Sequence, residues 1–274
     1  MKIHGICLVK NESDILRYFL RESARWCDRI YIYDNGSTDG TWELACEIAR
    51  ESPRVIPFKQ EGKPFRDHLR GEVFRRYRGD AVEGDWWCRL DADEVYIDDP
   101  PAFLARVPRS CHVVWSAHLQ YMITEKDLPR FRPEDEVKAP EATVETLPRH
   151  YIANASEARF FRHRNRLRWD ETSWPTHMGL VSPERIRVKH LQYRSPAQIA
   201  RRLSTRHTAA QRGYLHFEHE TQQSWREKIA DSSGLHFDAG DGRYVVDPAQ
   251  LPNHLEPRWV RAMKRVMHGC GFWA

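Results

Sequence analysis

The sequence lacks the features that define several classes of protein. Its six cysteines include no C-x-x-C pair and lie mainly in apolar segments, which favours buried free thiols in a reducing compartment. No apolar run approaches the roughly 20 residues that a membrane span needs. No signal sequence is visible, because Met1 leads directly into a strand pattern. We therefore expect a cytoplasmic protein, either free or at the inner face of the membrane.

The chain also has little net charge, although positive charge is concentrated in two stretches. The net charge is only +4 over 274 residues, which does not point to nucleic acid. Arginines nevertheless crowd residues 159–168 and recur in 201–212. Such basic strips suit anionic ligands: a nucleotide diphosphate, an acidic acceptor or lipid headgroups.

The first hundred residues alternate between strand and helix patterns. Apolar runs predict strands over residues 3–9, 30–33, 55–58 and 85–90. Helical spacing predicts a first helix capped by Ser13 and two more over 41–50 and 65–77. This alternation predicts an α/β fold, a Rossmann-type nucleotide-binding half with a mostly parallel sheet and right-handed crossovers.

The pattern becomes mixed after residue 100. Residues 124–148 are rich in proline, glutamate and charge, which predicts a long surface loop. The remaining expected elements are strands near 112–115, 159–162 and 186–188, a short strand or loop at 243–246, and helices over 195–211, 218–229 and 257–268.

Two carboxylates stand where the fourth predicted strand ends. Asp91 and Asp93 are two residues apart, so at a strand end they point to the same side of the backbone. In an open α/β sheet, acids at this edge are suited to a metal ion and a phosphorylated ligand. The sequence therefore predicts an enzyme that acts on a metal-bound diphosphate.

Four passages, taken in order, carry a resemblance to a known family. Val9–Glu12 forms an opening strand and turn, and Tyr33–Thr41 is close to a D-(D/N)-G-S-T-D-G-T signature. Trp86–Glu94 contains a D-x-D strand, and Val188–Ser195 is similar to a late K-H-Y-x-Y-R-S passage. With these motifs the chain resembles the family 2 glycosyltransferases, whose fold is called GT-A. The resemblance covers the first half well, the second half in patches, and nothing beyond Arg212.

The resemblance implies both an organisation and a reaction. Residues 1–99 would be the nucleotide-sugar-binding half of one domain, 100–194 its acceptor-binding half, and 195–274 a C-terminal helical extension. The reaction would be a metal-dependent, inverting transfer of a sugar from a nucleoside diphosphate, with a UDP-sugar as the favoured donor. The acceptor would be a saccharide, a lipid-linked sugar, a peptide side chain or a modified nucleic-acid base.

The predicted metal site combines a carboxylate with an imidazole. Asp93 is our candidate for the direct metal ligand, and Asp91 for a contact to the ribose or a support of the metal site. By the resemblance, His190 would be a second metal ligand, which favours Mn²⁺ over Mg²⁺ because imidazole is softer than carboxylate. The alternative for His190 is a partly buried histidine that is hydrogen-bonded to the backbone.

The predicted donor contacts each have a structural alternative. By the resemblance Asp34 would contact the nucleobase, yet it is also placed to close its own turn. Asn11 and Glu12 would contact the donor or cap the following helix. Arg66, or its neighbours Lys63 and Arg70, would pair with the diphosphate, or lie on a solvated helix face.

An inverting transfer also needs a base that takes the proton of the acceptor. Asp170 is the first candidate, Glu171 the second and His177 the third. The chain has His177-Met178 where this branch of the family often has a His-Glu pair, so the match is poor here. The alternative for each acid is a loop residue paired with a neighbouring arginine.

Two other functions use similar features. A nucleotidyltransferase of similar fold also gathers acids around a metal, but it usually has a glycine-rich basic loop where this chain has Lys10–Asp14. A non-catalytic nucleotide- or carbohydrate-binding module would not need the intact acids. The last helix has an apolar stripe among arginines that suits an anionic membrane surface, although docking onto its own domain is the favoured reading. Nothing in the sequence indicates the oligomeric state.

Overall fold

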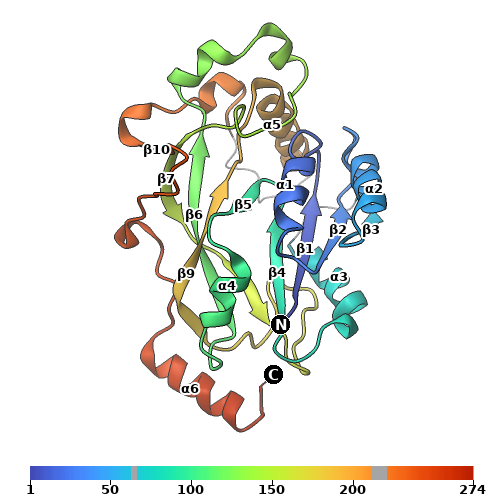
Figure 1. Ribbon diagram of the computed structural model, residues 1–274, viewed down its shortest axis with the longest axis vertical. Helices are drawn as coiled ribbons and strands as arrows, with labels where there is room; N and C mark the ends of the chain where they lie inside the picture. The colour runs from blue at the N-terminus through green and yellow to red at the C-terminus, as the bar shows by residue number, and fades with distance from the viewer. Residues whose placement is uncertain (63–66, 212–220, 274) are drawn as a thin grey trace.

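A mixed β-sheet forms the frame of the protein (Figure 1). The computed structural model describes residues 1–62, 67–211 and 221–273. The strands follow the order β10–β7–β6–β8–β4–β1–β2–β3, while β9 pairs with β6 and β5 pairs with β9. Their bounds are β1 Ile3–Val9, β2 Arg29–Asp34, β3 Val55–Gln60, β4 Trp86–Asp91, β5 Glu94–Tyr96, β6 Val113–Met122, β7 His150–Ala155, β8 Ala158–Arg162, β9 Val181–His190 and β10 His236–Phe237.

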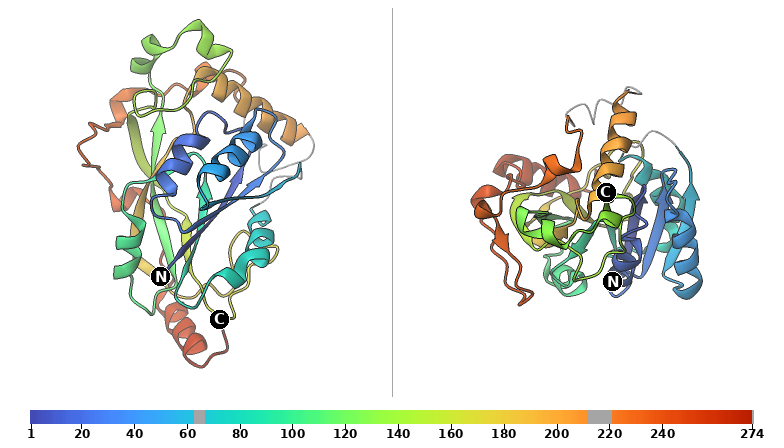
Figure 2. Two further views of the ribbon diagram at one scale, coloured as in Figure 1. Left: turned by 45° about the vertical axis from the view of Figure 1, so that its right-hand side comes forward. Right: turned by 90° about the horizontal axis from the view of Figure 1, so that it is seen from above.

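The first half confirms the predicted α/β alternation. Strands β3, β2, β1 and β4 are parallel, and β1 is buried along its whole length because helices cover both of its faces (Figures 1 and 2). Helices α1 (Leu16–Ser23) and α2 (Thr41–Glu51) pack on one face through Phe19 and Ile48. Helix α3 (Leu69–Tyr77) packs on the other face through Val73 and Phe74.

The second half extends the same sheet. Strand β8 pairs antiparallel with β4, β6 pairs antiparallel with β8, and β9 lies parallel to β6. The segment between β6 and β7 contains only short 3₁₀ turns at 125–130 and 133–136. The sheet thus crosses the expected boundary at residue 99 without interruption; the division into 1–99, 100–194 and 195–274 stays a prediction.

Two local predictions are wrong. Helix α1 has no side-chain cap, because the Ser13 hydroxyl donates instead to Asp39 over 2.8 Å. The second is the helix expected over 218–229, of which the structure describes residues 221–229. These residues form only a 3₁₀ turn at 225–228, which Ser224 caps with an extended backbone. Of the two alternatives predicted for residues 243–246, a short strand or a loop, the structure shows the loop.

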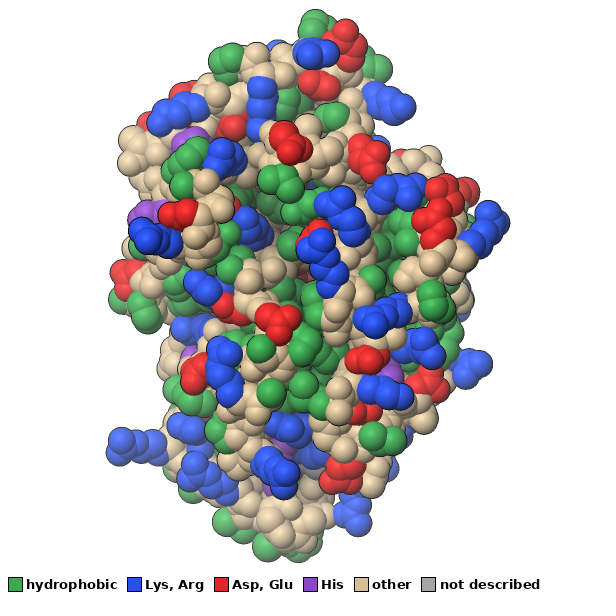
Figure 3. All heavy atoms as spheres, viewed as in Figure 1, with side chains coloured by type: hydrophobic (Ala, Val, Ile, Leu, Met, Phe, Trp, Pro, Cys, Tyr) green, Lys and Arg blue, Asp and Glu red, His purple; other side chains and the backbone are tan. Residues whose placement is uncertain are grey.

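Three further helices lie around the sheet. Helix α4 (Pro100–Arg106) packs with α1 and α2, and α5 (Pro196–Gln211) lies near the carboxyl ends of the parallel strands (Figures 1 and 2). Helix α6 (Arg258–Gly269) lies at the opposite, lower end, where hydrophobic and basic side chains occur together (Figure 3). Within the described ranges, no helix is both long and apolar enough to cross a membrane.

Candidate active site

A pocket of about 690 Å³ opens at the carboxyl ends of β1, β2 and β4, beneath α5. This volume is in the range of small-molecule sites, and the position is where open α/β sheets bind nucleotides. The pocket is lined by five of the predicted site residues, Asn11, Glu12, Asp91, Asp93 and His190, and by their neighbours Asn35, Gly36, Asp67, Arg89, Gln120, Glu157, Arg159, Arg201 and Arg202.

The loops after β1 and β2 are bonded to each other at one wall of the pocket. Asn11 adopts φ 56°, a left-handed conformation that asparagine tolerates. Its side-chain oxygen accepts from the backbone N–H of Thr38 (2.8 Å), and its own N–H donates to the Ser37 hydroxyl (2.8 Å). These bonds fix a polar rim in advance of any ligand.

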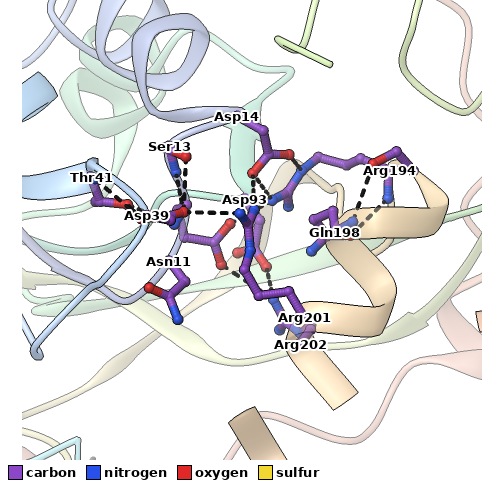
Figure 4. Close-up of polar contacts among 12 residues, drawn as sticks. Asn11, Ser13, Asp14, Asp39, Thr41, Asp93, Arg194, Gln198, Arg201 and Arg202 are labelled. Atoms are coloured by element: carbon purple, nitrogen blue, oxygen red, sulfur yellow. Dashed lines mark hydrogen bonds and ion pairs between the residues drawn. The ribbon is translucent and has the colours of Figure 1, made fainter. Parts of the chain in front are cut away.

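Asp39 ties the same two loops together a few residues further on (Figure 4). It accepts from the backbone and hydroxyl of Ser13 at 3.2 and 2.8 Å and from the Thr41 N–H at 3.1 Å. The Thr41 hydroxyl in turn accepts from the N–H of Glu12 (2.9 Å). The signature after β2 therefore acts first as a scaffold for the β1 loop.

Asp34 is placed as a turn-closing residue. It is fully buried, and its Oδ1 accepts from the Ser37 N–H over 2.7 Å. Its Oδ2 is also buried and has no hydrogen-bond partner among the described residues. Asp34 itself does not line the pocket, whereas the adjacent Asn35 and Gly36 do. The nucleobase contact predicted for Asp34 stays a prediction. The diphosphate contact predicted for Arg66 falls outside the described residues.

Asp91 is held between two buried arginines. Its carboxylate pairs with Arg70 of α3 and, over 2.6 Å, with Arg159 of β8. Burial alone would raise the pKa of Asp91, but the two guanidinium groups hold it well below its usual range. The alternative prediction that Arg70 lies on a solvated helix face is therefore wrong, because this side chain is fully buried and also pairs with Asp67.

Asp93 and His190 face each other across the pocket floor. The Asp93 Oδ2 lies 3.5 Å from His190 Nε2, and the pairing of β5 with β9 brings them together by setting Glu94 opposite His190. Gln120 Oε1 lies 2.6 Å from His190 Nδ1, so Nδ1 carries the proton and, in the neutral ring, the Nε2 lone pair faces the carboxylate. Two acceptors that converge in this way fit a divalent cation.

Helix α5 brings positive charge onto these acids (Figure 4). Arg202 lies 3.2 Å from Asp93 and 3.3 Å from Glu12, while Arg194 forms a buried pair with Asp14 at 2.8 Å. Burial would raise the pKa of Asp93, but His190 in its protonated form and Arg202 keep that pKa well below its usual range. For Glu12 burial prevails over Arg194, and its pKa rises to about 7.

Glu157 is the most exposed carboxylate of the pocket. It follows β7, and its side chain is 45% exposed, with Arg159 at 3.4 Å and Arg89 at 3.7 Å. Glu94 by contrast is buried in a pair with Arg159. Burial lowers the pKa of Arg89 to about 10, and in the part of the chain that the structure describes the Nε and one terminal nitrogen of this arginine have no hydrogen-bond partner.

The three candidate bases lie away from this pocket. Asp170 is exposed beside Arg75, at 3.9 Å, on the outer side of α3. The adjacent Glu171 is exposed as well. His177 stacks on Trp273 near the C-terminal helix. None of the three lines the pocket, since the segment that carries them packs behind α3 and beside α6. Their catalytic role stays a prediction.

Several residues of the site were not predicted from sequence in their observed roles. Gln120, Asp14 and Arg194 gave no motif that marks them, although Arg194 falls within the late passage at 188–195. Arg159 and Arg202 belong to the arginine-rich strips, so charge density was the available signal. Their partners are up to 190 positions away in the chain, as for Glu12 with Arg202.

A comparison with family models decides what this domain is. Residues 6–130 match the model described as Glycosyl transferase family 2. Residues 6–130 form a family 2 glycosyltransferase domain. This GT-A domain contains the loops after β1 and β2, the acids after β4 and Gln120. His190 and Arg202 lie beyond the matched residues. A search of curated proteins returned no match.

Solved structures similar to the chain include three glycosyltransferases. Mannosyltransferase PcManGT from Pyrobaculum calidifontis, in complex with GDP-Man and Mn²⁺, is 13% identical, with 75% of this chain and 61% of that chain covered and a TM-score of 0.41. S. aureus TarS 1–349 is 16% identical, with 80% and 68% covered and a TM-score of 0.34. GalNAc-T7 with UDP, GalNAc and Mn²⁺ is 12% identical, with 72% and 44% covered and a TM-score of 0.38. The chain thus spans less than two thirds of the mannosyltransferase and of GalNAc-T7.

Proposed function

We propose that this protein is a metal-dependent, inverting glycosyltransferase with a nucleoside diphosphate sugar as donor, first of all a UDP-sugar. The observation that carries the proposal is the convergence of Asp93 Oδ2 and His190 Nε2, 3.5 Å apart, at the end of β4 in a family 2 domain. The acceptor is a saccharide, a lipid-linked sugar, a peptide or another nucleophile. The cytoplasmic location also stays a prediction.

Asp93 and His190 would hold a divalent cation, Mn²⁺ before Mg²⁺. Among the residues that the structure describes, no three His, Cys, Asp or Glu side chains converge on one point. The remaining ligands would therefore be diphosphate oxygens and water, as is usual for cations at phosphate sites. When bound, such a cation supplies positive charge next to the diphosphate that leaves.

Arg202 is suited to a second role at the diphosphate. In the protein alone it pairs with Glu12 and Asp93. A guanidinium group forms paired hydrogen bonds with phosphate oxygens as well as with carboxylates. We therefore expect Arg202 to turn from Asp93 towards the donor, while the bonded loops after β1 and β2 hold the nucleoside side.

We propose Glu157 as the base. It replaces the three candidates predicted from the sequence, which are Asp170, Glu171 and His177. Glu157 already lines the pocket, and its ion pairs, at 3.4 and 3.7 Å, are longer than those that hold Asp91. In the transfer, the acceptor atom bonds to the anomeric carbon while the bond to the diphosphate oxygen breaks on the opposite face. The acceptor proton passes to the Glu157 carboxylate.

The proposal is tested by incubating the protein with nucleoside diphosphate sugars and Mn²⁺. We expect release or transfer of the sugar, together with a rise in the melting temperature with UDP that requires Mn²⁺. The Asp93→Asn variant should lose both the rise and at least about a hundredfold of the turnover. Exposed Glu134→Gln serves as the matched control and should keep both.

Each other outcome has a clear meaning. Release of pyrophosphate from a nucleoside triphosphate would favour the nucleotidyltransferase, and binding without turnover would favour a binding module. An Asp93→Asn variant with full turnover and an unchanged response to Mn²⁺ would refute the metal site.

A further inference from the structure

Helix α6 exposes its apolar side. Trp259, Met263 and Val266 recur at helical spacing and are 70%, 42% and 61% exposed, and Phe272 just beyond the helix is 75% exposed. Ala262 lies between them and is exposed too. The sequence analysis favoured docking of this stripe onto the domain. That expectation is wrong, because the stripe faces outward.

The opposite, more polar side of α6 holds the helix on the domain. Lys264 donates to the carbonyl of Gly179 over 2.9 Å and pairs with Glu256 at 2.5 Å. His268 lies 3.2 Å from a terminal nitrogen of Arg164. A helix on the surface of a domain normally docks through its apolar stripe. The reversed orientation leaves a stripe that no described part of the chain covers.

The charges around the stripe are of one sign. Helix α6 contains no aspartate or glutamate, and Glu256, two residues before the helix, is paired with Lys264. Arg258 and Arg265 are exposed along one edge of the stripe. Exposed Arg166 donates to the carbonyl of Gly271 and adds a further positive charge beside Phe272. Figure 3 shows hydrophobic and basic side chains together at this end of the molecule.

We propose that α6 and Phe272 form a docking surface for an anionic lipid membrane. An outward apolar stripe bordered by arginines is the arrangement with which interfacial helices insert among acidic headgroups. A second copy of the chain would bring the same arginines against one another, so charge disfavours it. The surface is separate from the pocket, because α6 contacts the opposite end of the sheet (Figure 1).

The experiment measures co-sedimentation of the full chain with vesicles, in the absence of donor and metal. We expect binding to vesicles of phosphatidylglycerol and phosphatidylcholine at least about tenfold stronger than to phosphatidylcholine alone, and weaker with added salt. The double variant Trp259→Ser/Val266→Ser should lose about tenfold in binding, and so should Arg258→Gln/Arg265→Gln. All these side chains are exposed, so the melting temperature should not change.

Two control variants lie outside the stripe. Val137→Ser changes a valine that is 86% exposed, and Arg243→Gln changes an exposed arginine on another part of the surface. Both should bind like the wild type. Equal binding to neutral and anionic vesicles, or none to either, would overturn the proposal. So would a dimer in solution that Trp259→Ser/Val266→Ser dissociates, since the stripe would then be covered by a second copy. Because no donor is present, these outcomes are independent of the proposed transferase activity.

Discussion

At the scale of single residues, the two aspartates of the D-x-D strand have different partners. Asp91 forms ion pairs with Arg70 and Arg159, and both arginines are fully or almost fully buried. Asp93 is paired with His190 and with Arg202, which are partly exposed. Removing one member of the buried group leaves an uncompensated charge, whereas Asp93 can exchange one cation for another. These contacts support the proposal that Asp93 is the metal ligand and that Asp91 has a positioning role.

The identity of the base is decided by two matched substitutions. We expect Glu157→Gln to lower turnover by about 10²- to 10⁴-fold while donor binding changes little, because the variant can no longer accept the proton of the acceptor. Asp170→Asn should behave like the wild type, since Asp170 is exposed behind α3. The measurement is kcat together with the Kd of the donor for both variants. The reverse result would return the role to Asp170 and would require residues 168–178 to move into the pocket.

At the scale of elements, α3 is held close to the segment that follows β8. A Cβ atom built on Gly71 would lie 2.0 Å from the carbonyl oxygen of Asp170 and 2.7 Å from that of Trp169. Both atoms belong to the backbone and cannot turn aside. Gly71 is therefore required by the close approach of the two segments.

We expect Gly71→Ala to lower the free energy of unfolding by about 1–3 kcal/mol, because a methyl group has to push the two segments apart. The measurement is urea unfolding followed by circular dichroism. Gly79→Ala is the control, since a Cβ at Gly79 meets no atom within 4 Å. Equal stability of Gly71→Ala and the wild type would show that residues 169–170 are not packed as described.

The sequence predicted elements better than contacts. Strand β1 and the end of β4 were predictable because continuous apolar runs mark parallel strands buried on both faces. The position of His190 came from a family resemblance, since nothing local shows that β9 pairs with β5. Charge density marked the strip that contains Arg202 but not its partners, and nothing marked Gln120, because the roles of both depend on side chains far away in the chain. The loop after β8, which contains the predicted bases, has no periodic pattern. The base that we propose, Glu157, lies instead between β7 and β8.

At the scale of the whole molecule, the lower end of the sheet gathers positive charge around His112. Burial lowers the pKa of His112 to about 3, and Arg164, His268, Arg162 and Lys264 act in the same direction. In the unfolded chain the imidazole titrates near its ordinary value of 6.5. As the pH falls below that value, the unfolded state takes up a proton that the folded state does not.

His112 therefore makes the protein less stable as the pH falls from about 6.5 towards about 3. We expect the urea midpoint of the wild type to fall further between about pH 7.5 and about pH 5 than that of His112→Gln. Exposed His236→Gln should follow the wild type. Parallel pH profiles of the wild type and His112→Gln would contradict the assignment.

The partners of Asp93 also have a consequence for biosynthesis. Its facing groups come from residues 190 and 202, which leave the ribosome long after the last residue that matches the family model, 130. A nascent chain of that length already contains every strand of the parallel half, yet it has no counter-charge for the carboxylate. The cation and nucleotide site that we propose around Asp93 is thus incomplete until β9 and α5 have been synthesised, and we expect a product truncated at residue 130 to bind neither.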